Sequence, residues 1–371
     1  MELINATKMQ AAYTMGMEPS GRELLVVAIK GTFQLPESGE PPQLVNEQMP
    51  LIMADTFTGE PGLSAPIYET DFAPKKSRCD VLLLGSAYAP GGDPCPRVGV
   101  GLQVGSMRKR FVVTGPRKWK ANMLSVTAGQ PEPFVCQSIS YDIAFGGVDN
   151  QHENEKKHVA FMVNPVGTGF HKHLKTEWVD GAPMPRTEQF NTPITAPYKA
   201  YKPQSFGPIG RGWEPRSGYG GTYDQHWIDE IFPFLPPDFN DLYYQAAPLD
   251  QQTDFIQGGE EVILINLTPN GRVQFNLPQT EMPVYFFPRK GDHIEHQAKA
   301  DTIVFEPDLK RFTMTWRTHL PLKKNMFEIA QVVAGKKSKA WWRARRLGKE
   351  YYSSLDKVPA KKKTDVEIFT P

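Results

Sequence analysis

The residues best suited to acid–base chemistry lie in the stretch 222–230, TYDQHWIDE. Asp224 and His226 are close enough along the chain for a carboxylate and an imidazole to share a proton-transfer role. The structural alternative is that Tyr223 and Trp227 anchor a turn to the core while Asp224 accepts hydrogen bonds from backbone amides. Carboxylates in aromatic, glycine-rich loops commonly do the latter, so we favour a structural role for this stretch.

Two histidine pairs raise the question of a metal site. His171 and His173 flank Lys172, and in a strand both imidazoles would lie on one face. His293 and His296 share a face only in a helix, whereas the residues before them are typical of a turn. Neither pair has an evident third ligand in the sequence. We therefore expect no bound metal and no cofactor.

The sequence lacks the common catalytic signatures. It contains no GxSxG, HExxH, GxxxxGK[ST], EF-hand or GxGxxG motif. The glycines at 99 and 101 and at 146 and 147 lack the strand, loop and helix N-terminus that cradle a phosphate. These absences favour a protein that is not an enzyme.

Charge is distributed unevenly along the 371 residues. The formal net charge is +1, yet residues 336–363 contain eleven Lys or Arg and only two acidic residues, which gives this segment +9. The remainder has 31 basic and 39 acidic residues, or −8. An acidic body with a basic C-terminal segment predicts either an acidic partner or docking of the segment on its own body.

Residues 338–352 (SKAWWRARRLGKEYY) are the best helix candidate. Trp341 and Trp342 would point about 100° apart on a helix, so both cannot face one flat surface. We expect one of them to pack on the body and the other to contribute, with Arg345 and Arg346, to binding a partner. Basic residues interleaved with aromatic ones could also bind nucleic acid. The acidic body favours self-docking or an acidic protein, so we do not expect nucleic acid.

Proline (34) and glycine (31) together make up more than the average share of the chain and show no period. This pattern disfavours long helices and favours short strands joined by turns. Residues 327–333 could form a strand or a helix. Strand-like runs with turn residues between them occupy residues 23–33, 80–84, 98–104, 110–114, 261–267, 272–277, 283–287, 302–305 and 311–317.

These runs predict a mainly β fold with sandwich- or barrel-like sheets, long irregular loops rich in aromatic residues, Gly and Pro, and a C-terminal helix. We expect a body of residues 1–335, with a candidate division into two packed β subdomains near 125–140. Residues 336–371 would form the basic helix followed, from Pro359, by a solvated Lys-rich tail.

The sequence shows no sign of a membrane-spanning helix, a secretory leader or a disulfide framework. No apolar run approaches the roughly 20 residues of a membrane-spanning helix, and the N-terminus lacks the pattern of a secretory leader. Three cysteines without CxxC spacing, Cys79, Cys95 and Cys136, argue against a disulfide framework. We expect a protein of the reducing cytoplasm.

Residues 141–248 are dense in aromatic residues, Gly and Pro and have little periodicity, which is typical of a functional loop or a packed cap over a sheet. Within them, residues 205–216 read SFGPIGRGWEPR. We expect Phe206 and Trp213 to anchor this segment and Arg216 to pair with a nearby carboxylate. If these side chains are exposed, they are instead candidates for contacts with a partner, because Trp and Arg are favoured at interfaces.

Nine segments, in order, carry a resemblance to one bacterial family, catalogued as domain of unknown function 2169 and found beside type VI secretion effectors. The resemblance runs from about residue 21 to about residue 321. The segments are LLVVAIKGTF (24–33), ETDFAPKKSRCDVLLLGSAYAP (69–90), YDIAFGG (141–147), NPVGTGF (164–170), FGPIGRGWEPR (206–216), GTYDQHW (221–227), LPPDFND (235–241), AAPLDQQ (246–252) and TWR (315–317).

This resemblance implies an adaptor or chaperone that binds a cognate secretion effector, often one with a PAAR-like domain, and helps to load it on the VgrG spike. No catalytic residue is associated with such a role. Two rivals stay open: an enzyme of unknown reaction using Asp224 and His226, and a nucleic-acid-binding protein using the basic segment. Our candidate partner-binding residues are Phe206, Trp213, Arg216, Tyr223, Trp227, Trp341, Trp342, Arg345 and Arg346.

Overall fold

The largest sheet is built around a strand that is buried on both faces. In the computed structural model, which describes residues 1–352, 354 and 357, the 12-residue strand β3 has ten consecutive buried residues. Hydrophobic side chains fill one face of this sheet, and a layer of paired charges covers part of the other. Its strands, in spatial order, are β18 (Gln252–Thr253), β6 (Cys79–Leu83), β23 (Lys299–Glu306), β24 (Arg311–Pro321), β3 (Glu23–Gln34) and β2 (Gln10–Met17).

A second sheet shows the alternation expected of a strand with one face in the core. In β8 the residues Val98, Val100, Leu102 and Val104 are buried, and those between them are not. Asn270 and Gly271 lie in the loop of the hairpin between β19 and β20. The strands, in spatial order, are β17 (Thr187–Glu188), β9 (Met107–Thr114), β8 (Arg97–Val104), β19 (Glu261–Ile265) and β20 (Arg272–Asn276).

These two sheets share one hydrophobic core. Phe275 of β20 contacts Phe305 of β23 and Phe312 of β24, with ring centroids 6.4 and 5.6 Å apart. In the described part of the chain the sheets do not close into a barrel. The predicted mainly β, sandwich-like fold is therefore confirmed.

A third sheet joins the two ends of the body. Residues 327–333, for which both strand and helix were open, form a short turn and then strand β25, consistent with their β-branched residues. β1 pairs in parallel with β25, and neither β1 nor β2 was predicted from the sequence. The strands, in spatial order, are β1 (Glu2–Asn5), β25 (Ile329–Ala334), β21 (Pro283–Pro288) and β22 (Ile294–Gln297).

The irregular middle of the chain has a small core of its own. Trp119, Phe145, Val179, Met184 and Ile194 are buried together there. Outside the three sheets, the remaining strands form short pairs, accompanied by one short helix. They are β4 (Thr56–Phe57) with β5 (Pro66–Tyr68), β7 (Gly85–Tyr88) with β12 (Cys136–Ile139), β10 (Trp119–Ala121) with β11 (Val126–Ala128), β13 (Phe145–Gly146) with β16 (Thr168–Gly169), β14 (Val148–Asp149) with β15 (Val159–Ala160), and α1 (Thr176–Val179).

The chain divides into two units, Met1–Ala334 and Gly335–Pro371. The second unit contains helix α2 (Lys339–Arg346), which is shorter than the helix predicted over residues 338–352. It begins after Ser338, whose hydroxyl accepts a hydrogen bond from the backbone N–H of Trp341 (3.2 Å). It ends before Gly348, whose φ of +61° is typical of a glycine that terminates a helix.

The predictions about a membrane span and about the C-terminal tail have different outcomes. None of the helices in the described part is long and apolar enough to cross a membrane. The solvated tail predicted from Pro359 lies outside the described residues. The division of the body near residues 125–140 stays a prediction.

Candidate functional site

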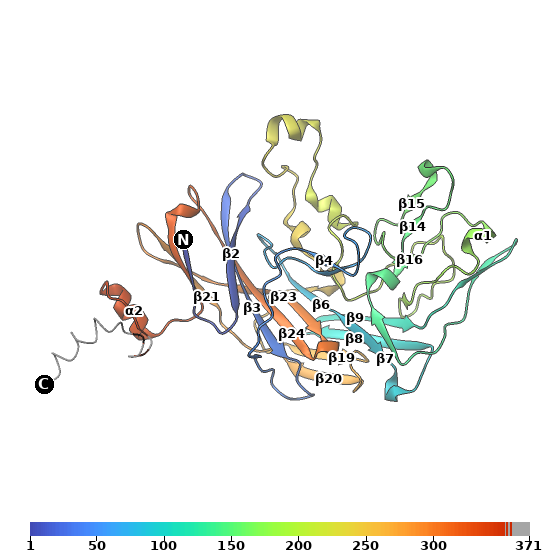
Figure 1. Cartoon of the computed structure of the whole chain (residues 1–371), viewed down its shortest axis with the longest axis horizontal. Helices are drawn as coiled ribbons and strands as arrows, with labels where there is room; N and C mark the ends of the chain where they lie inside the picture. Colours follow the sequence, from blue (N-terminus) through green and yellow to red (C-terminus); the bar gives the residue numbers. More distant parts are fainter. Residues whose placement is uncertain (353, 355–356, 358–371) are drawn as a thin grey trace. The chain divides into compact units, whose positions relative to one another are not determined.

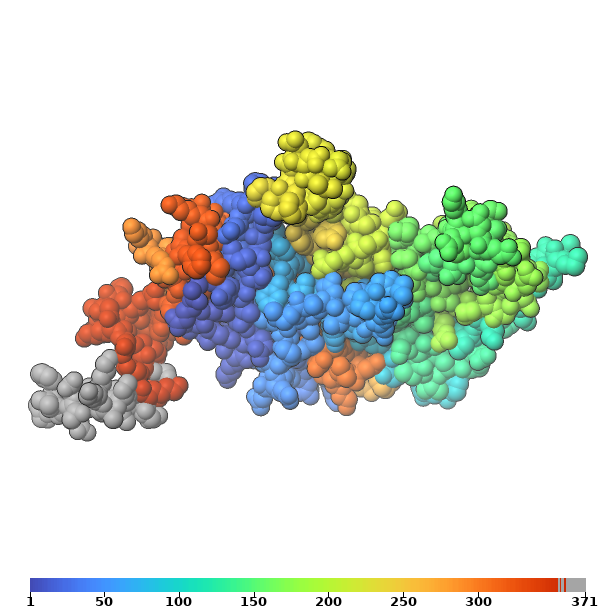
Figure 2. Space-filling model, turned by 45° about the horizontal axis from the view of Figure 1, so that its top comes forward, coloured from blue at the N-terminus to red at the C-terminus, as the bar shows by residue number. Residues whose placement is uncertain are grey.

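A loop with exposed aromatic side chains stands out from the first unit. This loop, residues 221–239, is the aromatic lobe, drawn in yellow in Figures 1 and 2. Large apolar side chains are normally buried or scattered singly, so a group of them in one loop indicates an interaction site. Four are largely exposed: Tyr223 (55%), Ile228 (55%), Phe232 (66%) and Phe234 (46%).

Hydrogen bonds close the lobe at its base. The backbone N–H of Thr222 donates to Asp238 Oδ1 (3.0 Å), and the Thr222 hydroxyl donates to Asp238 Oδ2 (2.7 Å). Beside them, the N–H of Asn240 donates to the carbonyl of Tyr219 (2.9 Å). The backbone and side-chain hydrogen bonds from Thr222 lower the pKa of Asp238. The lobe is therefore a clamped loop whose two ends lie side by side.

Trp227 organises the interior of the lobe. Its backbone N–H donates to Asp224 Oδ1 (2.9 Å), and its indole N–H donates to the carbonyl of Phe234 (2.9 Å). Its ring lies against those of Tyr223 and Phe232, with centroids 4.8 and 5.5 Å away. Asp224 thus accepts a backbone hydrogen bond, as the structural interpretation expected. The expected anchoring of Tyr223 and Trp227 in the core is wrong, because they pack within the lobe.

The clamp gives a prediction about local stability. We expect Asp238→Ala to loosen the lobe without lowering the melting temperature of the protein, because Asp238 is exposed and its bonds are confined to the base of the loop. Hydrogen–deuterium exchange should be faster over residues 222–236 and unchanged in the strands of the sandwich. The pKa of Asp238 is lower in the folded state than in the unfolded state. The stabilisation by the clamp is therefore fully present above the unfolded-state pKa and is lost as pH falls through the folded-state pKa. Unchanged exchange in the lobe would show that the clamp does not order it.

Below the lobe, buried residues fasten the segment 205–216. Phe206 is fully buried against Phe111, with ring centroids 4.6 Å apart, and Trp213 is buried edge-on against Tyr141 at 5.4 Å. Arg216 is also buried and pairs with Glu69. These side chains anchor the segment. Their burial in this conformation gives a partner no direct access to them.

Arg216 and Arg211 share one carboxylate. Arg216 also donates from Nε to the carbonyl of Tyr243 and from Nη1 to that of Ile209, both at 2.8 Å. Arg211 pairs with Glu69 and, through Nε, with Asp55 Oδ2 (2.8 Å). Burial opposes ionisation of Arg211, but the hydrogen bond to Asp55 and the charge of Glu69 outweigh it and raise its pKa. Two guanidinium groups and two carboxylates are thus paired in one cluster.

A second set of charges, the buried polar layer, lies on the face of the large sheet that is turned away from the hydrophobic core. Each cation in it has a carboxylate partner: Lys30 Nζ lies 2.8 Å from Asp71, Lys76 Nζ lies 2.6 Å from Asp80, and Arg317 pairs with Asp301. All six side chains are at least nine-tenths buried. Such closure favours a structural role over catalysis, because a substrate has no route to these groups.

The segments that carry the family resemblance bind to one another. The Thr168 hydroxyl donates to the carbonyl of Asp142 (2.7 Å), and the side-chain amide of Asn164 donates to the carbonyl of Tyr141 (2.9 Å). Asp80 accepts from the N–H of Ala246 (2.8 Å). Many of the residues in these segments therefore hold loops together. Hydrogen bonds between segments so far apart in the chain leave no local signal in the sequence.

Comparison with protein families agrees with this pattern of shared segments. The family model described as "Uncharacterized protein conserved in bacteria (DUF2169)" matches residues 20–317. The chain belongs to the DUF2169 family. Neither the curated proteins nor the solved structures contain a match.

Two histidines of this DUF2169 protein, His152 and His173, lie side by side with ring centroids 5.5 Å apart. His171 and His173 lie in an irregular segment, not a strand, and His173 Nδ1 is 2.9 Å from Asp149 Oδ2. Among the described residues, no group of three or more His, Cys, Asp or Glu could hold a metal ion. Cys79, Cys95 and Cys136 are free thiols, and burial raises the pKa of Cys79 well above its ordinary value.

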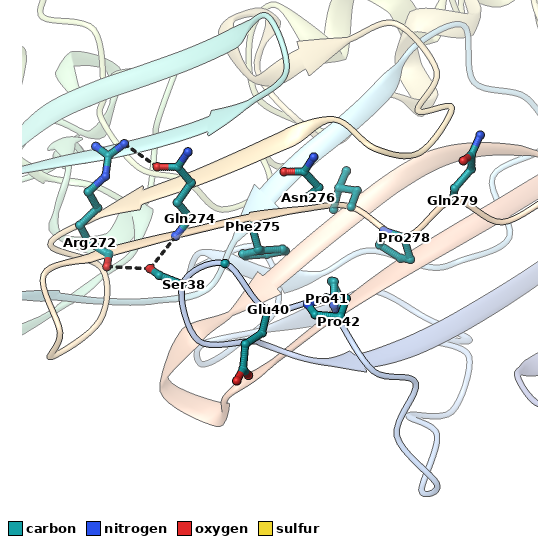
Figure 3. Close-up of a pocket in the computed structure, with 12 residues that line it drawn as sticks. Ser38, Glu40, Pro41, Pro42, Arg272, Gln274, Phe275, Asn276, Pro278 and Gln279 are labelled. Atoms are coloured by element: carbon teal, nitrogen blue, oxygen red, sulfur yellow. Dashed lines mark hydrogen bonds between the residues drawn. The ribbon is translucent and has the colours of Figure 1, made fainter.

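A broad groove of about 1010 Å³ follows the edge of the second sheet in the DUF2169 fold (Figure 3). The loop at Ser38 covers part of this edge: Gln274 donates its N–H to Ser38 Oγ (3.1 Å), and Gly39 donates to the Gln274 carbonyl (2.8 Å). This cover protects an edge strand that could otherwise pair with another chain. Prolines and amides line most of the rest, with no acid–base pair suited to catalysis.

The predicted residues of the second unit lie on one short helix. The rings of Trp341 and Trp342 meet edge-on at 5.0 Å, and Trp341 is the more buried. The guanidinium of Arg345 lies 5.3 Å from the Trp341 ring, and Arg346 is exposed. The different burial of the two rings fits their different directions on the helix. Their role in binding a partner stays a prediction.

Proposed function

We propose that this DUF2169 protein is a non-enzymatic cytoplasmic adaptor or chaperone for a type VI secretion effector. The effector would carry a PAAR-like domain, and the adaptor would assist its loading on the VgrG spike. The aromatic lobe is the observation that supports this most directly. Exposed Tyr223, Ile228, Phe232 and Phe234 supply the apolar area that anchors protein interfaces.

Two features weigh against the rival functions. Asp224 and His226 are exposed on the lobe, and Asp224 already bonds the Trp227 backbone, whereas acid–base pairs of enzymes commonly sit in clefts. Outside the basic segment the chain carries −8, which repels phosphate backbones. The buried charged groups are tied into the fold by their own partners.

Co-purification with the products of adjacent genes tests the adaptor role. We expect one of these products to bind the full chain, and Phe232→Ser to weaken that binding about ten-fold or more, as loss of an aromatic anchor does. Phe327→Ser is the matched control, because Phe327 is equally exposed (68%) but lies outside the lobe. Failure of every adjacent product to bind would refute the adaptor proposal. Equal loss from both variants would remove the lobe from the interface.

A further inference from the structure

The aromatic lobe lies in the longest stretch of the chain without a basic residue. Between Arg216 and Arg272 there is no Lys or Arg, and there are nine Asp or Glu. Four of these nine belong to the lobe and are exposed: Asp224, Asp229, Glu230 and Asp238. The lobe therefore presents apolar rings and negative charge on the same small surface.

This combination restricts what can bind. A partner with an acidic surface would be repelled as its carboxylates approached those of the lobe, and a nucleic acid would be repelled by the same charge. A purely apolar partner would leave the carboxylates without counter-charges when water is excluded. A partner with an apolar socket surrounded by Lys or Arg would bury the rings in the socket and pair the carboxylates with positive charges.

We propose that the aromatic lobe binds a protein partner that presents an apolar socket rimmed by Lys and Arg. The inference rests on the proposed adaptor function and specifies the chemistry of its partner. Phe232 and Phe234 supply the apolar contact, while Asp229 and Glu230 select for positive charge and speed the encounter. Because the clamp at Thr222 and Asp238 closes the loop before binding, less order has to be gained in the complex.

Two matched peptides test this chemistry on the full chain without knowledge of the effector. Both are amphipathic with the same leucine pattern, and one carries Lys where the other carries Glu. Fluorescence anisotropy should show about ten-fold tighter binding of the Lys peptide, with an affinity that falls as salt is raised. Equal affinities for the two peptides would overturn the proposal.

Variants place the binding on the lobe. Asp229→Lys/Glu230→Lys and, separately, Phe232→Ser should each weaken binding of the Lys peptide about ten-fold. Glu153→Lys/Glu155→Lys makes the same charge change at exposed positions outside the lobe and should change binding less than two-fold. Equal loss in the two charge variants would show that only the net charge matters, which would also overturn the proposal.

A second copy of the chain is the other source of a basic surface, because residues 336–363 carry +9. Sedimentation of the wild type should show no self-association that depends on the lobe. Self-association abolished by Asp229→Lys/Glu230→Lys would assign the lobe to a second copy and overturn a separate partner. Peptide selectivity without any effector binding would refute the adaptor role alone, whereas effector binding that ignores lobe charge would refute only this inference.

Discussion

Replacing Arg317 with Met should lower the free energy of unfolding by about 3–5 kcal/mol, because it leaves a buried carboxylate without its partner. Arg317 pairs with Asp301, and its Nε and Nη2 donate to the carbonyl of Asp71 at 3.1 and 2.8 Å. Both charged side chains are almost fully buried. Urea unfolding measures the loss. Arg97→Met is the control and should cost about 1 kcal/mol or less, because Arg97 is half exposed and Glu188 keeps Arg117.

The loss should also depend on pH. Burial raises the pKa of Asp301 even with Arg317 present. A carboxyl group whose pKa is higher in the folded state binds more protons there, so its contribution to stability is lost as pH rises through the folded pKa. Without the guanidinium this pKa rises further, so the variant should be closer to wild type at pH 5 than at pH 8. An equal loss at both values would contradict a role for the unpaired Asp301 carboxylate.

Arg216→Met should have an effect of similar size, about 3–5 kcal/mol, since it leaves Glu69 and two partly buried carbonyl groups short of a donor. Arg211→Met is the comparison, because Arg211 shares Glu69 but is 29% exposed, and water can replace part of its role. We expect it to cost about 1 kcal/mol, again by urea unfolding. Equal losses would show that Arg216 is not the central fastening of this segment.

Arg216→Lys separates charge from geometry. Lysine keeps the positive charge but lacks the planar group that reaches the carbonyls of Tyr243 and Ile209 as well as Glu69. We expect most of the loss of Arg216→Met to remain in Arg216→Lys. Near-wild-type stability of the lysine variant would mean that charge alone suffices.

The fold class and most of the long strands were predictable from the sequence. Alternation in residues 98–104 and the continuous apolar run in 24–29 indicate how many faces of each strand are buried. The sequence also predicted that Trp213 is an anchor and that Arg216 has a carboxylate partner, because aromatic and charged side chains in Gly- and Pro-rich segments need fixed contacts. Family membership followed from the same segments.

The contacts between residues that are distant in the sequence could not be predicted and became evident from the fold. Glu69 lies 147 positions before Arg216 in the sequence, yet the two side chains are in contact. β1 and β25 lie at opposite ends of the sequence of the body, yet they pair in one sheet. Local patterns record burial and turn geometry but not the distant partner. The aromatic lobe shows the same limit, since Tyr223 and Trp227 have the composition of core anchors. The main core is filled by residues from distant strands, and the rings of Tyr223 and Trp227 pack against each other within the lobe.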